Sequence, residues 1–387
     1  MKCPICQSVK VNRFLERFNV PVHQNLICPS KEIARNVKRG NLSLVVCKEC
    51  GFVFNQSFDE NLLSYGKNYD NTQISSPIFQ DYIDNLIYYL IKKRGIVNKT
   101  IVEIGCGKGS FLKSLCLEGR NCGIGFDPSY VGPSILMDGR LRFERSFYGP
   151  GCDSIPADVV ICRHVIEHVS DTVNLLKAVR QALRKSPRAQ LFFETPDLDW
   201  ILKSHVFWDF FYEHCSYFTK QSLTAAFEIA GFDVKNIHNV FQDQYLWSEA
   251  KLSNRRSHNI RKLPGRIPVL AKQFAERDRV LIQRWQKRLK ELHSLGRVAI
   301  WGAGAKGVTF ANLLDPHCKW IDCVVDLNPN KQGRFVPGTG HPIVSYQDLP
   351  KRGVATAILM NPNYREENQV LLQNAGIKLN LINLEEG

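Results

Sequence analysis

The chain has 387 residues, of which 44% are hydrophobic and 23% are charged, and this composition excludes a disordered protein. The length predicts two or three domains rather than one core. The longest apolar runs are strand-sized, well short of the roughly 18 residues that a membrane helix needs, and the N-terminus has no apolar signal core. We therefore expect a cytoplasmic protein with no membrane span, whose 13 Cys residues are thiols or metal ligands rather than disulfides.

The formal net charge of +14 raises the question of a polyanionic partner such as nucleic acid. Most of the excess lies between Lys251 and Glu291, where thirteen Lys and Arg residues accompany three acidic residues. Apolar residues recur in this segment with helical spacing, which favours a packed, solvated helical linker over 251–294. We therefore do not expect nucleic acid to be the main partner.

Two CxxC pairs mark the first region, residues 1–75. Two thiolates three positions apart on a tight turn clasp one tetrahedral ion, and two such pairs complete a four-sulfur site. The spacing therefore predicts a structural zinc ion with no open position for water. His23 and Cys28 lie between the pairs and are weaker candidates as ligands. The four predicted ligands are Cys3, Cys6, Cys47 and Cys50.

A strand, a glycine-rich turn and a helix follow one another in TIVEIGCGKGSFLKSLCLEG, residues 100–119. Glycines let the backbone approach a ligand, and the helix N-terminus supplies free N–H groups. The next strand ends at Asp127, whose carboxylate suits the ribose hydroxyls of an adenosine. Glu103 would repel a pyrophosphate but suits a cationic or zwitterionic ligand, so S-adenosylmethionine fits better than NAD. The glycines of the turn are Gly105, Gly107 and Gly109.

A second polar group follows the buried strand in ADVVICRHVIEHV. The carboxyl end of a strand is the usual ligand edge of such a sheet. We therefore expect these residues at the ligand edge of the sheet, and the stretch resembles the fourth-strand region of class I methyltransferases, which implies that they face the methyl donor and the acceptor. They are Arg163, His164, Glu167 and His168.

The stretch DFFYEHCSYF, residues 209–218, places Glu213 and His214 side by side among aromatic rings. Carboxylate and imidazole are costly in apolar surroundings unless they are paired or used. The stretch precedes a helix capped by Thr219, so it should cover the sheet edge where an acceptor would sit. Because the ordinary pKa of histidine is near neutrality, we predict that His214 acts as a general base. The alternative is a loop whose rings pack while the Glu–His pair faces solvent.

A second glycine-rich turn, GAGAKG at 302–307, follows the strand RVAIW and begins the last region. With Asp326 about twenty residues further on, it matches a dinucleotide fingerprint and by itself would indicate NAD. Lys306 beside such a turn also suits a phosphate.

In this order, the CxxC pairs, the ExGxGxG turn with EHCSYF, and the GAGAKG region resemble the three-domain C-methyltransferases of nucleotide-linked ketosugars. The resemblance covers nearly the whole chain and is closest in WGAGAKGVTFANLL and VVDLNPNKQGRFVPGTGHPIVSYQDL. It implies an α/β fold with a class I Rossmann-like methyltransferase domain between a small zinc-binding domain and a second Rossmann-like α/β domain. The last domain would carry no nicotinamide and would hold the nucleotide end of the substrate. The implied domains are 1–75, 76–250, the basic linker 251–294, and 295–387.

The resemblance also implies roles for individual residues. His214 would remove the acidic proton beside a sugar ketone, and the enolate carbon would attack the methyl group of S-adenosylmethionine. Glu213 belongs to the same motif, and His168 resembles the second active-site His, near the enolate oxygen. Tyr65 and Tyr69 resemble a Tyr-rich substrate lid.

One departure concerns the substrate. The family motif reads YHEHxSYF, whereas Phe211 occupies the Tyr position here and Tyr212 replaces the intervening His. Tyr212 is the candidate that would supply the missing phenol.

Three other functions stay open at this point. One is O-methylation of a sugar or small metabolite with His214 as base, and another is an NAD-linked bifunctional enzyme that uses both glycine turns. Nucleic-acid methylation is the third. It would need the basic residues Arg255, Arg256, Arg261 and Lys262.

Overall fold

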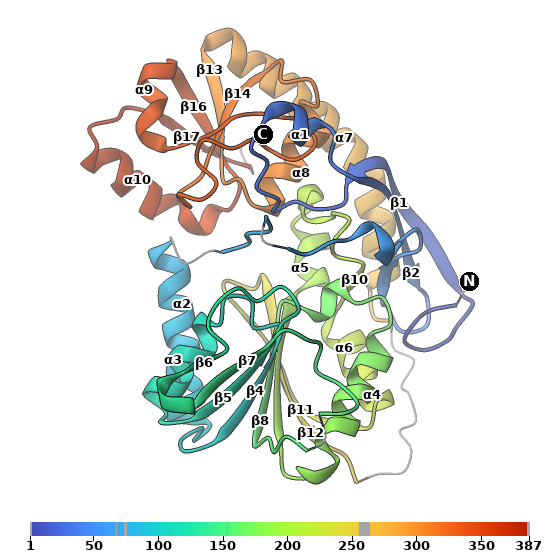
Figure 1. Cartoon of the computed structure of the whole chain (residues 1–387). Helices are drawn as coiled ribbons and strands as arrows, with labels where there is room; N and C mark the ends of the chain where they lie inside the picture. The colour runs from blue at the N-terminus through green and yellow to red at the C-terminus, as the bar shows by residue number, and fades with distance from the viewer. Residues whose placement is uncertain (1, 67, 73–75, 153, 255–263, 385–387) are drawn as a thin grey trace.

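The computed structural model describes residues 2–66, 68–72, 76–152, 154–254 and 264–384. These residues form a four-stranded antiparallel sheet, an eight-stranded mixed sheet and a five-stranded parallel sheet (Figure 1). The predicted α/β fold class is confirmed. Within the described ranges no helix has both the length and the apolar character needed to cross a bilayer. The predicted domain boundaries stay predictions.

The small sheet joins the N-terminal region to a distant segment of the chain. Its order is β1-β2-β3-β10, and β10 pairs antiparallel with β3 through Ser216 with Phe54 and Tyr217 with Val53. The stretch that carries Glu213 and His214 is therefore anchored in the N-terminal sheet. The elements are β1 (Val11–Pro21), α1 (Lys31–Arg35), β2 (Arg39–Cys47), β3 (Val53–Asn55) and β10 (Ser216–Tyr217).

The large sheet has the order β11-β12-β9-β8-β4-β5-β7-β6, with parallel pairing from β9 through β7. Its strands are β4 (Thr100–Ile104), β5 (Cys122–Phe126), β6 (Ile135–Leu136), β7 (Leu141–Glu144), β8 (Val159–Arg163), β9 (Gln190–Pro196), β11 (Phe232–Val240) and β12 (Tyr245–Leu252). Its helices are α2 (Pro77–Tyr88), α3 (Ser110–Glu118), α4 (Thr172–Ala182), α5 (Leu198–Lys203) and α6 (Lys220–Ile229).

Helices cover both faces of this sheet, because successive side chains of a strand point to opposite sides. In β8, Val159 and Ile161 pack into the core beneath α2 and α3, whereas Val160 and Cys162 pack into the core beneath α4 and α6. The predicted strand–turn–helix at 100–119 is observed as β4, the glycine turn and α3. The carboxyl ends of the parallel strands point toward the C-terminal part of the chain (Figure 1).

The C-terminal sheet is entirely parallel, in the order β15-β14-β13-β16-β17. Its strands are β13 (Arg297–Trp301), β14 (Ile321–Val325), β15 (Ile343–Val344), β16 (Val354–Leu359) and β17 (Asn380–Asn383). Its helices are α8 (Ala305–Leu314), α9 (Leu349–Arg352) and α10 (Arg365–Asn374).

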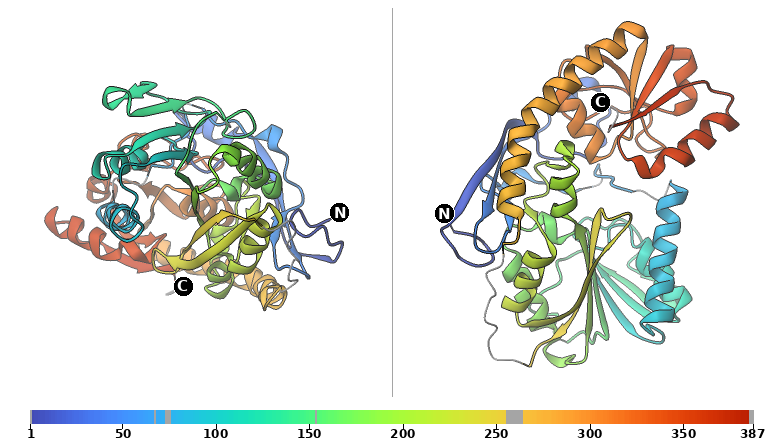
Figure 2. Two further views of the ribbon diagram at one scale, coloured as in Figure 1. Left: turned by 90° about the horizontal axis from the view of Figure 1, so that it is seen from below. Right: turned by 180° about the vertical axis from the view of Figure 1, so that it is seen from behind.

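The long helix α7 (Ile267–Leu295) runs past the N-terminal sheet and ends at β13 (Figure 2). Its predicted apolar stripe is buried at Phe274, Trp285 and Leu289, so the helical packing expected for the basic segment is observed. On α7, Asp278 pairs at 2.8 Å with the buried Arg17 of β1. The four basic residues that would test nucleic-acid binding lie outside the described residues.

Candidate active site

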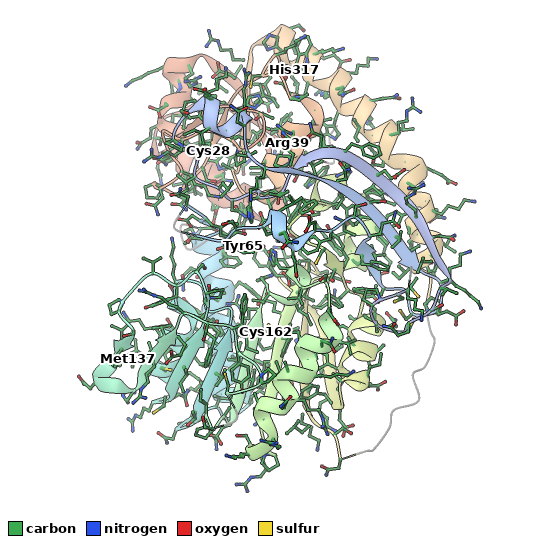
Figure 3. All side chains as sticks on the ribbon, turned by 45° about the vertical axis from the view of Figure 1, so that its right-hand side comes forward. Cys28, Arg39, Tyr65, Met137, Cys162 and His317 are labelled. Carbon is green, nitrogen blue, oxygen red and sulfur yellow. The ribbon has the colours of Figure 1, made fainter. Side chains whose placement is uncertain are left out.

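A cavity of about 280 Å³ lies between the N-terminal region, the central α/β part and the C-terminal α/β part of the chain. Figure 3 shows the N-terminal segment at Tyr65 passing between the two α/β parts of the molecule. The cavity wall combines residues from all three parts of the chain, as the predicted roles require. They include Asn25, Tyr69, His164, Glu167, His168, Phe211, Glu213, His214, Gln244, Gly302, Gly304, Lys306, Gly307, Asp326 and Lys331.

His214 lies on this wall, just before β10. Its ring centroid is 4.7 Å from that of His168, nearly perpendicular to it, and 4.2 Å from that of Phe211. Among the residues that the structure describes, none forms a hydrogen bond with the His214 imidazole. Burial, together with the positive charges of His168 and His164, holds the pKa of His214 well below its usual value. The ring is therefore neutral at neutral pH and free to accept a proton.

The neighbouring Glu213 is buried and held by the N-terminal region. Its Oε1 accepts a 2.6 Å hydrogen bond from the backbone N–H of Gln24, and its Oε2 accepts one of 2.7 Å from the hydroxyl of Tyr69. Burial opposes ionisation, but His23, the charge of His168 and the Gln24 amide outweigh it and lower the pKa of Glu213. The carboxylate is therefore ionised.

His23 belongs to this site and not to the cysteine cluster. The backbone N–H of Ser64 donates to His23 Nε2 at 2.9 Å, so Nδ1 carries the proton. Nδ1 lies 3.5 Å from Glu213 Oε2. The weaker expectation that His23 and Cys28 could be metal ligands is therefore wrong for His23. Cys28 is likewise not among the four residues whose sulfur atoms converge, and its backbone bridges to Phe335 of the C-terminal part.

Both Tyr residues of the predicted lid reach the site. The hydroxyl of Tyr65 lies 3.2 Å from His168 Nδ1, and the Tyr65 and Tyr69 ring centroids are 5.1 Å apart. Burial and the charge of Glu213 raise the pKa of Tyr69 well above its usual value, so it stays a neutral donor. Tyr65 thus contacts His168, and Tyr69 contacts the carboxylate of Glu213, the neighbour of His214.

Tyr212 does not supply the missing phenol. Its side chain is fully buried against the N-terminal sheet, where its hydroxyl accepts from the N–H of Asp59 at 2.8 Å. The ring covers Gly40 so closely that a Cβ there would lie 2.4 Å from it. Phe211, not Tyr212, lines the cavity. The prediction of Tyr212 as a substrate contact is therefore corrected, because its side chain is buried and its hydroxyl is held by Asp59.

The first glycine turn packs against the strand end that carries His168. Gly105 has a φ of +69°, and a Cβ there would lie 2.1 Å from a methyl group of Val165. The N–H of Gly107 donates to Asp127 Oδ2 at 2.9 Å, so Asp127 is fixed beside the turn. Asp127 retains acceptor capacity for the predicted ribose. The glycine turn therefore packs against Val165, three residues before His168.

Glu103 is the buried acid at the end of β4. Its Oε2 has no hydrogen-bond partner among the described side chains and backbone groups. Burial raises the pKa of Glu103 to about 8. The positive charge of Arg163 opposes this shift, and the negative charge of Asp127 adds to it. An unsatisfied buried carboxyl beside a glycine turn fits the ammonium group of the donor's amino acid part.

The other two predicted donor contacts, Arg163 and His164, belong to a buried ion network. Arg163 donates to Glu194 Oε2 at 2.5 Å and lies over the ring of Phe111. His164 has its two ring nitrogens 3.3 Å and 3.4 Å from the carboxylates of Glu167 and Glu194. Burial lowers the pKa of His164, but these carboxylates raise it further, to about 9. His164 lines the cavity as a cation, whereas Arg163 supports it from behind.

In the C-terminal part, Lys306 lies in the first turn of α8 and faces the cavity. Its Nζ is 3.1 Å from Asp209 Oδ2 and 3.1 Å from Gln244 Oε1. A second ammonium, that of the buried Lys331, contacts Asn25 Oδ1 at 3.1 Å and the carbonyl of Ala303 at 3.0 Å. The sequence assigns no role to Lys331, although it lies in VVDLNPNKQGRFVPGTGHPIVSYQDL, because this lysine is more than twenty residues from the GAGAKG turn beside which it folds.

The four predicted metal ligands come together at the edge of the N-terminal sheet. Their sulfur atoms all lie within 4.8 Å of one another, with Cys3–Cys50 at 3.6 Å and Cys6–Cys47 at 3.5 Å. A tetrahedral zinc ion with bonds of 2.3 Å requires sulfurs about 3.8 Å apart. The arrangement therefore fits such an ion.

Family profiles match two parts of the chain. Residues 77–237 match the profile of a methyltransferase domain, and residues 268–379 match that of the C-methyltransferase C-terminal domain. The C-methyltransferase NovU of Streptomyces niveus is 24% identical over 362 residues, which cover 87% of this chain and 84% of that protein. A ubiquinone biosynthesis O-methyltransferase of Yersinia enterocolitica is 27% identical over 117 residues, 28% of this chain and about half (48%) of that protein.

Two solved structures are similar to part of the chain. An S-adenosylmethionine-dependent methyltransferase from Mesorhizobium loti is 17% identical, with a TM-score of 0.32 over 44% of this chain and 99% of that one. The 1,6-didemethyltoxoflavin-N1-methyltransferase of Burkholderia thailandensis is 16% identical, with a TM-score of 0.36 over 46% of this chain and 82% of that one.

Proposed function

We propose a reaction for this chain, which is an S-adenosylmethionine-dependent methyltransferase ending in the C-terminal domain of the C-methyltransferases. The methyl group goes to the carbon beside a ketone of a nucleotide-linked sugar. One observation carries the proposal: the neutral imidazole of His214, which has no hydrogen-bond partner among the described residues, lies beside His168 on a cavity wall that also contains the second glycine turn.

In the first step His214 acts as the base. A proton leaves the carbon beside the ketone for a ring nitrogen of His214, and the C–H electron pair moves to give an enolate. His168, held by Tyr65, donates a hydrogen bond to the oxygen on which charge develops.

In the second step the enolate carbon takes the methyl group. When bound, S-adenosylmethionine supplies that group as an electrophile on its sulfonium. Glu103 would pair with its ammonium and Asp127 with its ribose. Gly105 lets the turn that carries the donor approach Val165, close to the loop of His168.

Recognition of the nucleotide end is proposed for the second glycine turn. The N-terminus of α8 offers free N–H groups to a phosphate, and Lys306 adds an ammonium. Because Lys306 is held by Asp209 and Gln244, a phosphate would exchange for or share these partners. A structural zinc ion at the four cysteines is part of the same proposal.

Deuterium exchange tests the proposed first step. The enzyme should exchange the proton beside the carbonyl of a nucleotide-linked ketosugar with buffer deuterium in the absence of donor. Exchange should be lost in His214→Gln. If no ketosugar exchanges while a hydroxyl is methylated, the reaction is O-methylation and the carbon mechanism is wrong.

A further inference from the structure

Three side chains with metal-ligating atoms converge on the wall of the cavity. One ligand atom each from Glu167, His168 and His214 lies within 4.8 Å of the other two. The first two belong to a short helical turn after β8, and His214 precedes β10. All three line the cavity, so a bound ion would face the substrate space.

Outer contacts already orient two of these side chains. The hydroxyl of Thr195 donates to Glu167 Oε2 at 3.0 Å, and that of Tyr65 lies 3.2 Å from His168 Nδ1. The second ring nitrogen of His168 thus stays available. Such second contacts are typical of metal-ligating His and carboxylate groups, because they fix ring orientation and raise ligand basicity.

The remaining contacts leave one atom of each residue for an ion. Glu167 Oε1 lies 3.3 Å from Nδ1 of the cationic His164, so an ion would share this carboxylate oxygen with that ion pair. His214 has no hydrogen-bond partner in the described part of the chain. One carboxylate oxygen, shared with His164, and two imidazole nitrogens can therefore approach one point, where they would lie about 3.4 Å apart around an ion at 2.1 Å.

We propose that Glu167, His168 and His214 form a binding site for a divalent transition metal, separate from the four-cysteine site. Two imidazoles and one carboxylate favour zinc, cobalt, nickel or copper over magnesium and calcium, which prefer oxygen ligands. Three protein ligands leave at least one coordination position open toward the cavity.

The site also has a consequence for catalysis, and this part rests on the proposed function. A metal on His214 occupies the lone pair that would otherwise accept the substrate proton. Metal binding and proton abstraction therefore exclude each other. Divalent transition metals should inhibit the enzyme, and a chelator that leaves the cysteine site loaded should restore activity.

The test uses the full chain with one equivalent of zinc already at the cysteines, titrated with Cu²⁺. Electron paramagnetic resonance should show one copper ion per chain, with hyperfine structure from two imidazole nitrogens. Affinity should fall about tenfold or more in Glu167→Gln and in His168→Asn. It should be unchanged in His317→Asn, which alters an exposed histidine of the C-terminal part (Figure 3). Two separate variants and their melting curves guard against misfolding of either one.

The outcomes separate the two proposals. Absence of a saturable copper ion on the zinc-loaded chain, or equal affinity in all three variants, overturns the metal site. Deuterium exchange by the metal-free enzyme that Cu²⁺ suppresses supports both proposals. Copper bound with two nitrogen ligands to an enzyme that exchanges no ketosugar proton supports the metal site and contradicts the proposed reaction.

Discussion

The hydroxyl of Tyr69 donates a 2.7 Å hydrogen bond to Oε2 of Glu213, 144 positions further along the chain. The contact joins the segment before α2 to the residue beside the proposed base. Since Glu213 is also held by Gln24, the N-terminal region builds one side of the active cavity. Catalysis should therefore depend on residues far from the methyltransferase sheet.

Replacing Tyr69 by Phe tests this dependence. A hydrogen bond to a charged group is worth about 1.5–3 kcal/mol, so kcat/KM for exchange should fall roughly tenfold to one hundredfold. Steady-state rates with a nucleotide–ketosugar measure it. The control is Tyr88→Phe, which alters an exposed phenol on α2. Equal rates for Tyr69→Phe and the unchanged enzyme would show that the contact plays no part.

His23 should set the acidic limit of activity. Burial favours the protonated form of Glu213, and His23 is the first of the groups that lower its pKa against this effect. Removing the donor in His23→Leu raises that pKa, so the carboxylate is lost at a higher pH on acidification. The acidic limb of kcat/KM should move to higher pH.

His23→Asn is the matched variant, because its amide can place a donor near the position of Nδ1. It should bring the limb back toward that of the unchanged enzyme, whereas a purely structural role would leave both variants alike. Identical pH profiles for all three proteins would mean that His23 does not act through Glu213.

Tyr212→Phe separates a structural role from a substrate role. The change removes the hydroxyl contacts with Asp59 inside the N-terminal region and should cost about 1 kcal/mol of unfolding free energy. Urea unfolding measures this loss. KM for the sugar substrate should stay the same, because Tyr212 does not line the cavity. An increase in KM with no loss of stability would restore the original prediction for this residue.

The proposed zinc site at the four cysteines should control activity, although these residues do not line the cavity. Cys47 is the last residue of β2, and Cys50 lies just before β3. Strand β3 in turn pairs with β10, the strand that follows His214. Cys47→Ser should lower zinc content, the melting temperature and the exchange rate together, because metal binding supports folding of such small regions. Cys122→Ser, at an exposed thiol, should change none of these. Full activity in zinc-free protein would refute the link.

The sequence predicted the features that depend on neighbouring residues. The turn at 100–119 and the thiol pairs are local patterns, and the structure contains both assemblies. The approach of His23 to Glu213 could not be read in this way, because it depends on how β10 joins the N-terminal sheet. Likewise, Phe211 lines the cavity whereas the hydroxyl of Tyr212 is held by the N-terminal region. Side-chain direction in an irregular segment follows from such distant contacts and not from spacing along the chain.

Glu103 gives the last prediction, on donor binding. Burial raises the pKa of this carboxyl to about 8, so it is largely protonated at neutral pH. An ammonium group of the ligand requires the ionised form, so binding must release a proton. Affinity for S-adenosylhomocysteine should therefore rise from about pH 6 to about pH 8, by up to about tenfold per unit.

Calorimetry in two buffers of different ionisation enthalpy measures both the affinity and the released proton. Glu103→Gln keeps the shape of the side chain but cannot ionise, so its weaker binding should lose most of this pH dependence. A slope shared by both proteins would assign the proton to another group. An affinity independent of pH in the unchanged enzyme would mean that the ammonium does not pair with Glu103, and the donor would then have to be held by the turn and Asp127 alone.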